Sequence, residues 1–137
     1  MQNNSLVPER VLVIVAHPDD MEFTCGGTIA KWAEAGSKIC LVLATSGDKG
    51  TKDRNKSPFH IAEIREQEQK KAAEVLGISE VIFLRHLDGE LEVTMDFRRQ
   101  ISTIIRKFEP NALITHDPWR AYQIHPDHRA VGMVRID

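Results

Sequence analysis

The sequence has few of the residues that mark specialised classes of protein. Only two of its 137 residues are cysteines, Cys25 and Cys40, which argues against a disulfide-rich secreted fold. No apolar run approaches the roughly 18 residues that suggest a transmembrane helix. Residues 1–10 also lack the apolar stretch of a signal peptide. We therefore expect a cytoplasmic protein that does not enter a membrane.

Aromatic residues and clustered positive charge are also scarce. Aromatic residues make up 6% of the chain, the formal net charge is −2, and lysine and arginine form no basic run. This composition disfavours a nucleic-acid partner. A GxGxxG fingerprint, a P-loop and a CxxC pair are all absent, which disfavours a Rossmann cofactor site and a zinc deaminase. With 42% hydrophobic and 28% charged residues, residues 1–137 are typical of one globular domain.

Apolar runs alternate with amphipathic stretches along the chain. Strands are expected at residues 10–15, 38–45, 80–85 and 112–116, and helices at residues 25–36, 59–77 and 94–108. A strand, a helix and a second strand in close succession form a βαβ unit with parallel strands. The predicted fold is therefore α/β, a Rossmann-like three-layer sandwich with a mostly parallel sheet and helices on both faces.

Several residues predict the ends and inner faces of the helices. Gly36 and Gly77 are expected to end the first and second helices, and Thr94 to cap the third. Helical spacing indicates which side chains of the second and third helices face the sheet. They are Ile61, Ile64, Ala72, Val75 and Leu76, and then Phe97, Ile101, Ile104, Ile105 and Phe108.

Two clusters of ionisable residues stand out. AHPDDME, residues 16–22, follows the first strand, and HPDH, residues 125–128, follows the last. Ligands of open α/β sheets bind at the carboxyl ends of the strands, and so many charges are costly to bury without a cation. A histidine and an aspartate from the first cluster and a histidine from the second supply three ligands, which is the usual number in a catalytic zinc site.

These motifs together resemble the PIG-L/LmbE-like family of zinc-dependent N-deacetylases. The matching pieces are AHPDDME, the GGT that opens the next helix, the REQE of the helix at 59–77, and HPDH. The run from DPW to HPDHR is most similar to the branch that deacetylates N-acetylglucosamine units of small chitin-derived sugars. Members of this family continue well beyond the length of this chain, so we expect the C-terminal part of the domain to be missing.

The resemblance implies a ligand set for Zn²⁺ consisting of His17, Asp20 and His128. It also implies that Asp19 is the general base. Consecutive side chains diverge, so Asp19 and Asp20 cannot both point at one metal without strain, and one ligand and one base is the natural division. The resemblance further implies that His125, with Asp127 behind it, handles protons, and that Glu22 braces the motif loop. Zinc-activated water, a free carboxylate and a partly protonated imidazole are what amide hydrolysis needs.

The expected function is removal of an acetyl group from a small N-acetylglucosamine-type sugar. Arg54, Trp119 and Tyr122 are candidate substrate contacts, although a solvated loop explains Arg54 and a structural role explains Trp119 equally well. His60 and His86 are expected at the surface. His116, at the end of the last strand, could contact substrate.

Two other functions remain open, and the state of assembly is a separate expectation. The chain could be a zinc hydrolase of another small N-acyl substrate, such as an acylated amino acid or nucleoside. It could also be a catalytically impaired metal-binding or nucleotide-binding module. A sheet whose last helix is cut short needs cover for an edge or face, so we expect a homo-oligomer.

Overall fold

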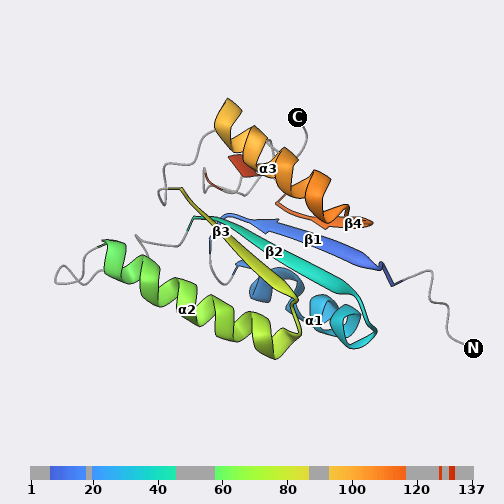
Figure 1. Ribbon diagram of the computed structural model, residues 1–137. Coiled ribbons are helices and arrows are strands. Elements are labelled where there is room, and N and C mark those ends of the chain that lie inside the picture. The colour runs from blue at the N-terminus through green and yellow to red at the C-terminus, as the bar shows by residue number, and fades with distance from the viewer. Residues whose placement is uncertain are drawn as a thin grey trace, which may run out of the picture.

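The computed structural model describes residues 7–17, 20–45, 58–86, 93–116, 127, 130 and 131, with the backbone alone for residues 20–25 and 58–59. In these residues, four parallel strands form one sheet in the order β3-β2-β1-β4 (Figure 1). The elements are β1 (Arg10–Val15), α1 (Asp20–Glu34), β2 (Lys38–Thr45), α2 (Pro58–Leu76), β3 (Glu80–His86), α3 (Met95–Phe108) and β4 (Ala112–Ile114). The predicted bounds of β1 and β2 are confirmed.

β1 and β2 form the centre of the sheet because nearly all of their side chains are apolar. In β1 the residues from Val11 to Val15 are buried, and in β2 every residue after Lys38 is buried. A parallel strand that is covered on both faces shows a continuous apolar run, without alternation of polar and apolar residues. The two runs therefore identified these strands correctly from the sequence.

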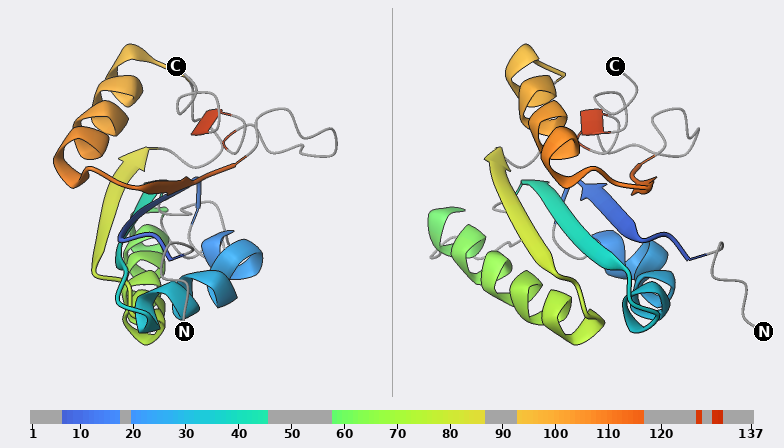
Figure 2. Two further views of the ribbon diagram at one scale, coloured as in Figure 1. Left: turned by 90° about the vertical axis from the view of Figure 1, so that its right-hand side faces the viewer. Right: turned by 45° about the vertical axis from the view of Figure 1, so that its right-hand side comes forward.

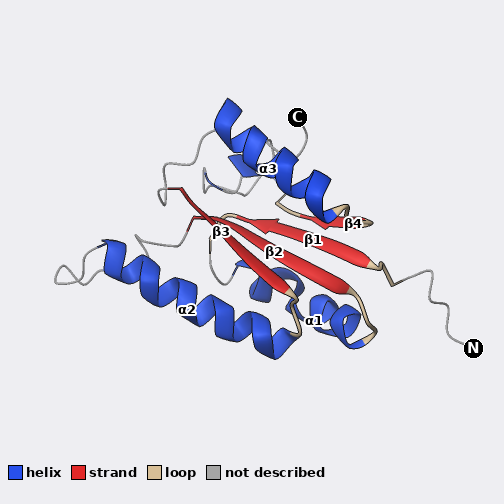
Figure 3. Ribbon diagram, viewed as in Figure 1, coloured by secondary structure: helices blue, strands red, loops and turns tan. Residues whose placement is uncertain are grey.

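Helices cover both faces of the sheet (Figure 2). α1 and α2 lie on one face, where Ile29 packs in a cluster with Val11 and Val13. α3 lies on the other face, where Phe97 packs in a cluster with Leu12 and Ile14. Alternate residues of β1 therefore point to opposite helical layers. This arrangement, also drawn by secondary structure in Figure 3, confirms the predicted three-layer α/β sandwich.

α1 begins earlier than the sequence indicated. The prediction placed residues 16–22 in a loop and began the helix at Cys25, whereas the helix begins at Asp20. Glu22 therefore belongs to the first helical turn, and whether its side chain braces the motif loop stays a prediction. Carboxylates stabilise the amino-terminal turn of a helix through its dipole, so these polar residues are compatible with a helix although they interrupt the apolar pattern.

The inner face of α2 also differs from the prediction. Val75 was expected to face the sheet, but it is 87% exposed. Leu76, the next residue, packs against the cluster on the α1 and α2 face. Adjacent helical residues point about 100° apart, and Val75 falls outside the buried stripe to which Leu76 belongs. Gln69 and Ala73 are the residues that α2 buries in addition to Ile61.

α3 follows the prediction closely. Phe97, Ile101 and Phe108 are buried, and Ile104 and Ile105 pack against the same cluster. The side-chain oxygen of Thr94 accepts the backbone N–H of Phe97 at 3.1 Å, as expected of an N-cap residue. No helix of the described residues is long and apolar enough to cross a bilayer.

Gly36 and Gly77 end α1 and α2, as predicted, through the same pair of backbone hydrogen bonds. Both have positive φ, 103° and 83°, a region that favours glycine. After α2, the N–H of Gly77 donates to Glu74 and that of Ile78 donates to Ala73, which is the Schellman pattern. A Cβ at Gly77 would lie 2.9 Å from Cβ of Ala33, so α1 and α2 approach closely at this glycine.

Candidate functional site

The strand order places a topological switch point between β1 and β4. The chain runs from β1 to β2 to β3 on one side, and it then crosses to β4 on the other side of β1. Connections that leave neighbouring strands in opposite directions open a crevice at the carboxyl ends, where ligands of such sheets bind. His17 follows the end of β1 and His116 follows the end of β4. Both histidines therefore lie at this edge.

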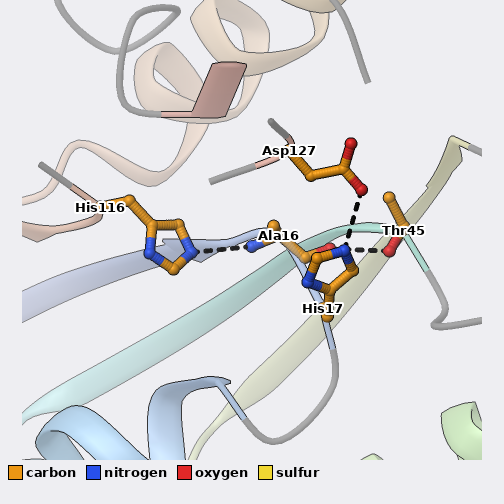
Figure 4. Close-up of polar contacts among 5 residues, drawn as sticks. All are labelled: Ala16, His17, Thr45, His116 and Asp127. Carbon is orange, nitrogen blue, oxygen red and sulfur yellow. Dashed lines mark hydrogen bonds and ion pairs between the residues drawn. The ribbon is translucent and has the colours of Figure 1, made fainter. Parts of the chain in front are cut away.

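Ala16, the residue before His17, forms hydrogen bonds with residues of the segments on either side of β1, at the ends of β2 and β4 (Figure 4). Its N–H donates to Nε2 of His116, with a nitrogen–nitrogen distance of 3.2 Å. Its carbonyl oxygen accepts the backbone N–H of Thr45 at 2.8 Å and the hydroxyl of Thr45 at 2.9 Å. Ala16 and Thr45 are completely buried. The start of the first ionisable cluster is therefore fixed to the ends of β2 and β4.

The side chain of His17 pairs with Asp127. Nε2 of His17 lies 2.8 Å from Oδ2 of Asp127, and the exposed fractions of the two side chains are 14% and 0%. A carboxylate without any solvent contact is costly unless a donor or cation accompanies it. When Asp127 is ionised and the imidazole is neutral, Nε2 of His17 donates to the carboxylate and Nδ1 carries the lone pair. The pair joins the two sequence clusters, which were expected at the same edge of the sheet.

The described residues fit one oriented histidine ligand of a metal site. Histidines that bind metals usually donate their other N–H to a carboxylate or carbonyl, which orients the ring. His17 has such a carboxylate in Asp127, and the backbone places Asp20 at the first residue of α1. Among the residues that the structure describes, no group of three histidine, cysteine, aspartate or glutamate side chains forms a complete ligand set. The side chain of Asp20 lies outside that description, as does His128.

The remaining predicted site residues lie outside the described part of the chain. These are Asp19, Arg54, Trp119, Tyr122 and His125, together with the side chain of Glu22. Asp127 was expected behind His125, and its contact with His17 was not foreseen. The pairing of Asp127 with His125 therefore stays a prediction.

Two other histidines are placed by the structure. His60 is exposed, as predicted. His86 was also expected at the surface, but it is half-buried and has two partners. Its Nε2 lies 2.6 Å from Oε1 of Gln100, and its ring centroid lies 5.0 Å from that of Phe97 in a tilted arrangement. His86 thus joins β3 to α3. The sequence concealed this role because Gln100 and His86 belong to different elements.

The fold and the site define the chain as a Rossmann-like α/β protein with a histidine–carboxylate pair at its switch point. A profile of the PIG-L family, described as GlcNAc-PI de-N-acetylase, matches residues 12–136. The chain belongs to this family.

Two curated relatives and one solved structure extend the comparison. Diacetylchitobiose deacetylase of Thermococcus kodakarensis is 40% identical over 129 residues, which cover 94% of this chain and 48% of that protein. The probable N-acetyl-alpha-D-glucosaminyl L-malate deacetylase 2 of Bacillus anthracis is 33% identical over 129 residues, covering 90% and 56%. The structure of N,N'-diacetylchitobiose deacetylase from Pyrococcus horikoshii superposes with a TM-score of 0.93 at 36% identity, covering 98% and 51%. The chain thus spans about half the length of these relatives.

Proposed function

We propose that this chain carries the reaction centre of a zinc-dependent N-deacetylase acting on an N-acetylglucosamine-type sugar. The observation that carries the proposal is the His17–Asp127 pair at the switch point between β1 and β4, in a chain of the PIG-L family. Two relatives support the substrate class, because the names of both describe deacetylases of N-acetylated glucosamine compounds. The two compounds differ in what is attached to the sugar, so the acetylated unit is the part in common.

His17, Asp20 and His128 are the proposed zinc ligands. When bound, zinc supplies Lewis acidity toward the acetyl oxygen and the attacking water. Asp127 orients His17 through the hydrogen bond to Nε2. Because Nε2 is engaged with the carboxylate, Nδ1 is the ring nitrogen of His17 that would be left to hold the metal.

Two side chains are proposed to move protons. Asp19 takes a proton from the attacking water, since a carboxylate beside a cation keeps a low pKa and stays ionised. His125 donates a proton to the departing amine, for which an imidazole is suited near neutral pH. Arg54, Trp119 and Tyr122 are proposed to contact the sugar.

We further propose that the protein forms a homo-oligomer. β4 is an edge strand of the described sheet and Leu113 within it is 37% exposed. Open sheet edges readily pair with another chain. Light scattering at micromolar concentration should therefore give a mass above that of one chain, and a monomer alone would contradict this part of the proposal.

The first experiment is the zinc content of the purified protein, measured by elemental analysis beside the His128→Ala and Asp19→Asn variants. We expect roughly one zinc per chain in the parent and in Asp19→Asn, and little in His128→Ala. Asp19→Asn should lose most of the activity while keeping its metal. A parent that binds no zinc after reconstitution would refute the proposed centre.

A panel of acetylated substrates then tests the substrate class. Release of free amine should be fastest from N-acetylglucosamine or its short oligomers, and slower from acetylated amino acids and nucleosides. A preference for acetylated amino acids or nucleosides would instead support a hydrolase of other small N-acyl compounds. Zinc binding without amine release from any substrate would support a catalytically impaired metal-binding chain.

A further inference from the structure

The β1–β4 ladder ends before the site begins. Val13 and Ile114 are its last paired residues, and β4 ends at Ile114, short of the predicted end at His116. The N–H of Ala16 lies beyond this point, and Ala16 has no exposed surface. A buried N–H without an acceptor is costly, because it has lost its hydrogen bond to water. The side chain of His116 meets this need, because its Nε2 accepts the N–H at 3.2 Å.

The hydrogen bond from Ala16 selects the tautomer of the neutral His116 ring. A backbone N–H can only donate, so Nε2 must present a lone pair and the ring proton of the neutral imidazole sits on Nδ1. A side chain without an acceptor at this position could not replace it. The side chain of His116 therefore takes the place of a backbone acceptor beyond the last residue pair of the β1–β4 ladder.

The hydrogen bonds of Ala16 restrain the position of His17 through the backbone. The carbonyl of Ala16 belongs to the peptide group that leads into His17, and Thr45 holds its oxygen by two hydrogen bonds. His116 holds the N–H on the other side of the same residue. Asp127 then holds the ring of His17. Figure 4 shows His116, Thr45 and Asp127 on different sides of Ala16 and His17.

We infer that His116 is a positioning residue for the proposed metal ligand His17, acting through the Ala16 backbone. This inference rests on the proposed zinc site for its consequence, but the contact itself can be measured without zinc. Loss of the acceptor frees the amide of Ala16 and widens the range of orientations that His17 samples. Zinc affinity should then fall by about tenfold, at the low end of what is found when groups that orient metal ligands are removed.

The test compares three variants. His116→Leu removes the acceptor and keeps a similar volume. His116→Gln restores an acceptor, because its Oε1 reaches about as far from the backbone as Nε2 of histidine. His60→Leu is the matched control, since His60 is exposed on α2. Hydrogen exchange of the Ala16 amide in the zinc-free protein reports the contact directly.

Zinc competition and the visible spectrum of the cobalt-substituted protein report how the contact between Ala16 and His116 affects the metal site. We expect His116→Leu to lose Ala16 protection, to bind zinc about tenfold more weakly and to shift the cobalt spectrum. His116→Gln and His60→Leu should resemble the parent in all three. Parent-like affinity and spectrum in His116→Leu would overturn the inference, as would a glutamine variant as impaired as the leucine one.

The outcomes also separate this inference from the proposed function. A parent that binds neither zinc nor cobalt would refute the proposed function, and the contact would then be judged by amide exchange alone. If His116→Leu does not fold, His116→Asn takes its place, because its shorter side chain cannot bring an acceptor to Ala16. Full protection of the Ala16 amide in that variant would overturn the inference.

Discussion

His17 and Asp127 are separated by 110 positions in the sequence, yet Nε2 of the histidine lies 2.8 Å from Oδ2 of the aspartate. His17 follows β1, whereas Asp127 comes from a segment beyond β4. The carboxylate is completely buried, so the imidazole offsets part of the cost of removing that charge from water. The contact therefore both stabilises the fold locally and orients a proposed metal ligand.

The first prediction concerns Asp127→Asn. The amide keeps the shape of the side chain and can still accept a hydrogen bond, but it removes the charge behind His17. We expect zinc affinity to fall by about 10–100-fold, as is typical when a carboxylate behind a ligating histidine is replaced. Chelator competition measures the affinity. Asp96→Asn is the control, because the Asp96 side chain is 88% exposed; equal affinities for the two variants would contradict the role given to Asp127.

The second prediction compares alanine at the two glycines that end helices. Gly36→Ala and Gly77→Ala both force a side chain into positive φ, which costs about 1–2 kcal/mol. Only Gly77→Ala also brings a Cβ to 2.9 Å from Ala33, whereas the space around Gly36 is open within 4 Å. Urea denaturation should therefore show the greater loss of stability for Gly77→Ala.

A double-mutant cycle isolates the contact between α1 and α2. Ala33→Gly removes the Cβ that collides with the new one at position 77. The two substitutions together should be less destabilising than the sum of their separate effects, by about 1 kcal/mol or more. Strict additivity would mean that the helices move apart at little cost.

The sequence predicted best those elements whose signals are local. β1 and β2 were identified by continuous apolar runs, and their bounds match the structure. Gly36 and Gly77 mark helix ends because the backbone there needs positive φ. These features depend on neighbouring residues in the chain, so no knowledge of the tertiary structure was needed.

Contacts between distant elements explain what the sequence did not show. Asp127 lies between two histidines in HPDH, and the family resemblance assigned it to His125. The structure adds a contact with His17, which the pairing of β4 with β1 at the switch point brings within reach. The bond from Ala16 to His116 depends on the same pairing. Strand order, and not residue pattern, decides these contacts.

The third prediction concerns Arg85 at the end of β3, which has a φ of 61° near a register shift between β2 and β3. Its guanidinium forms two hydrogen bonds of 3.1 Å with Glu66 of α2. These bonds, and then the charge of Glu66, raise the pKa of Arg85 above its ordinary value. Because the Arg85 side chain is 69% exposed, solvent screens the ion pair and its contribution to stability should be small.

Arg85→Gly and Arg85→Ala separate the backbone conformation from the ion pair. Both variants lose the contact with Glu66, but only glycine adopts positive φ without strain. We expect Arg85→Gly to be more stable than Arg85→Ala by about 1 kcal/mol in urea denaturation. Glu66→Gln, which removes the charge alone, measures the pair. An alanine variant as stable as the glycine variant would mean that the backbone relaxes out of this conformation.

The last prediction concerns alkaline pH and Cys40, which lies on β2 with 1% of its surface exposed. Burial, together with the nearby charge of Glu80, raises the pKa of the Cys40 thiol from 9.0 to about 12. Between these two values the unfolded chain releases the proton while the folded protein retains it, so the free energy of unfolding falls as pH rises. The loss due to Cys40 should reach about 1 kcal/mol at pH 10. Urea denaturation of the parent and of Cys40→Ala at pH 8, 9 and 10 measures it, because other groups titrate equally in both proteins. Stability should decline more steeply in the parent, and parallel declines would show that the folded protein releases the thiol proton as readily as the unfolded chain.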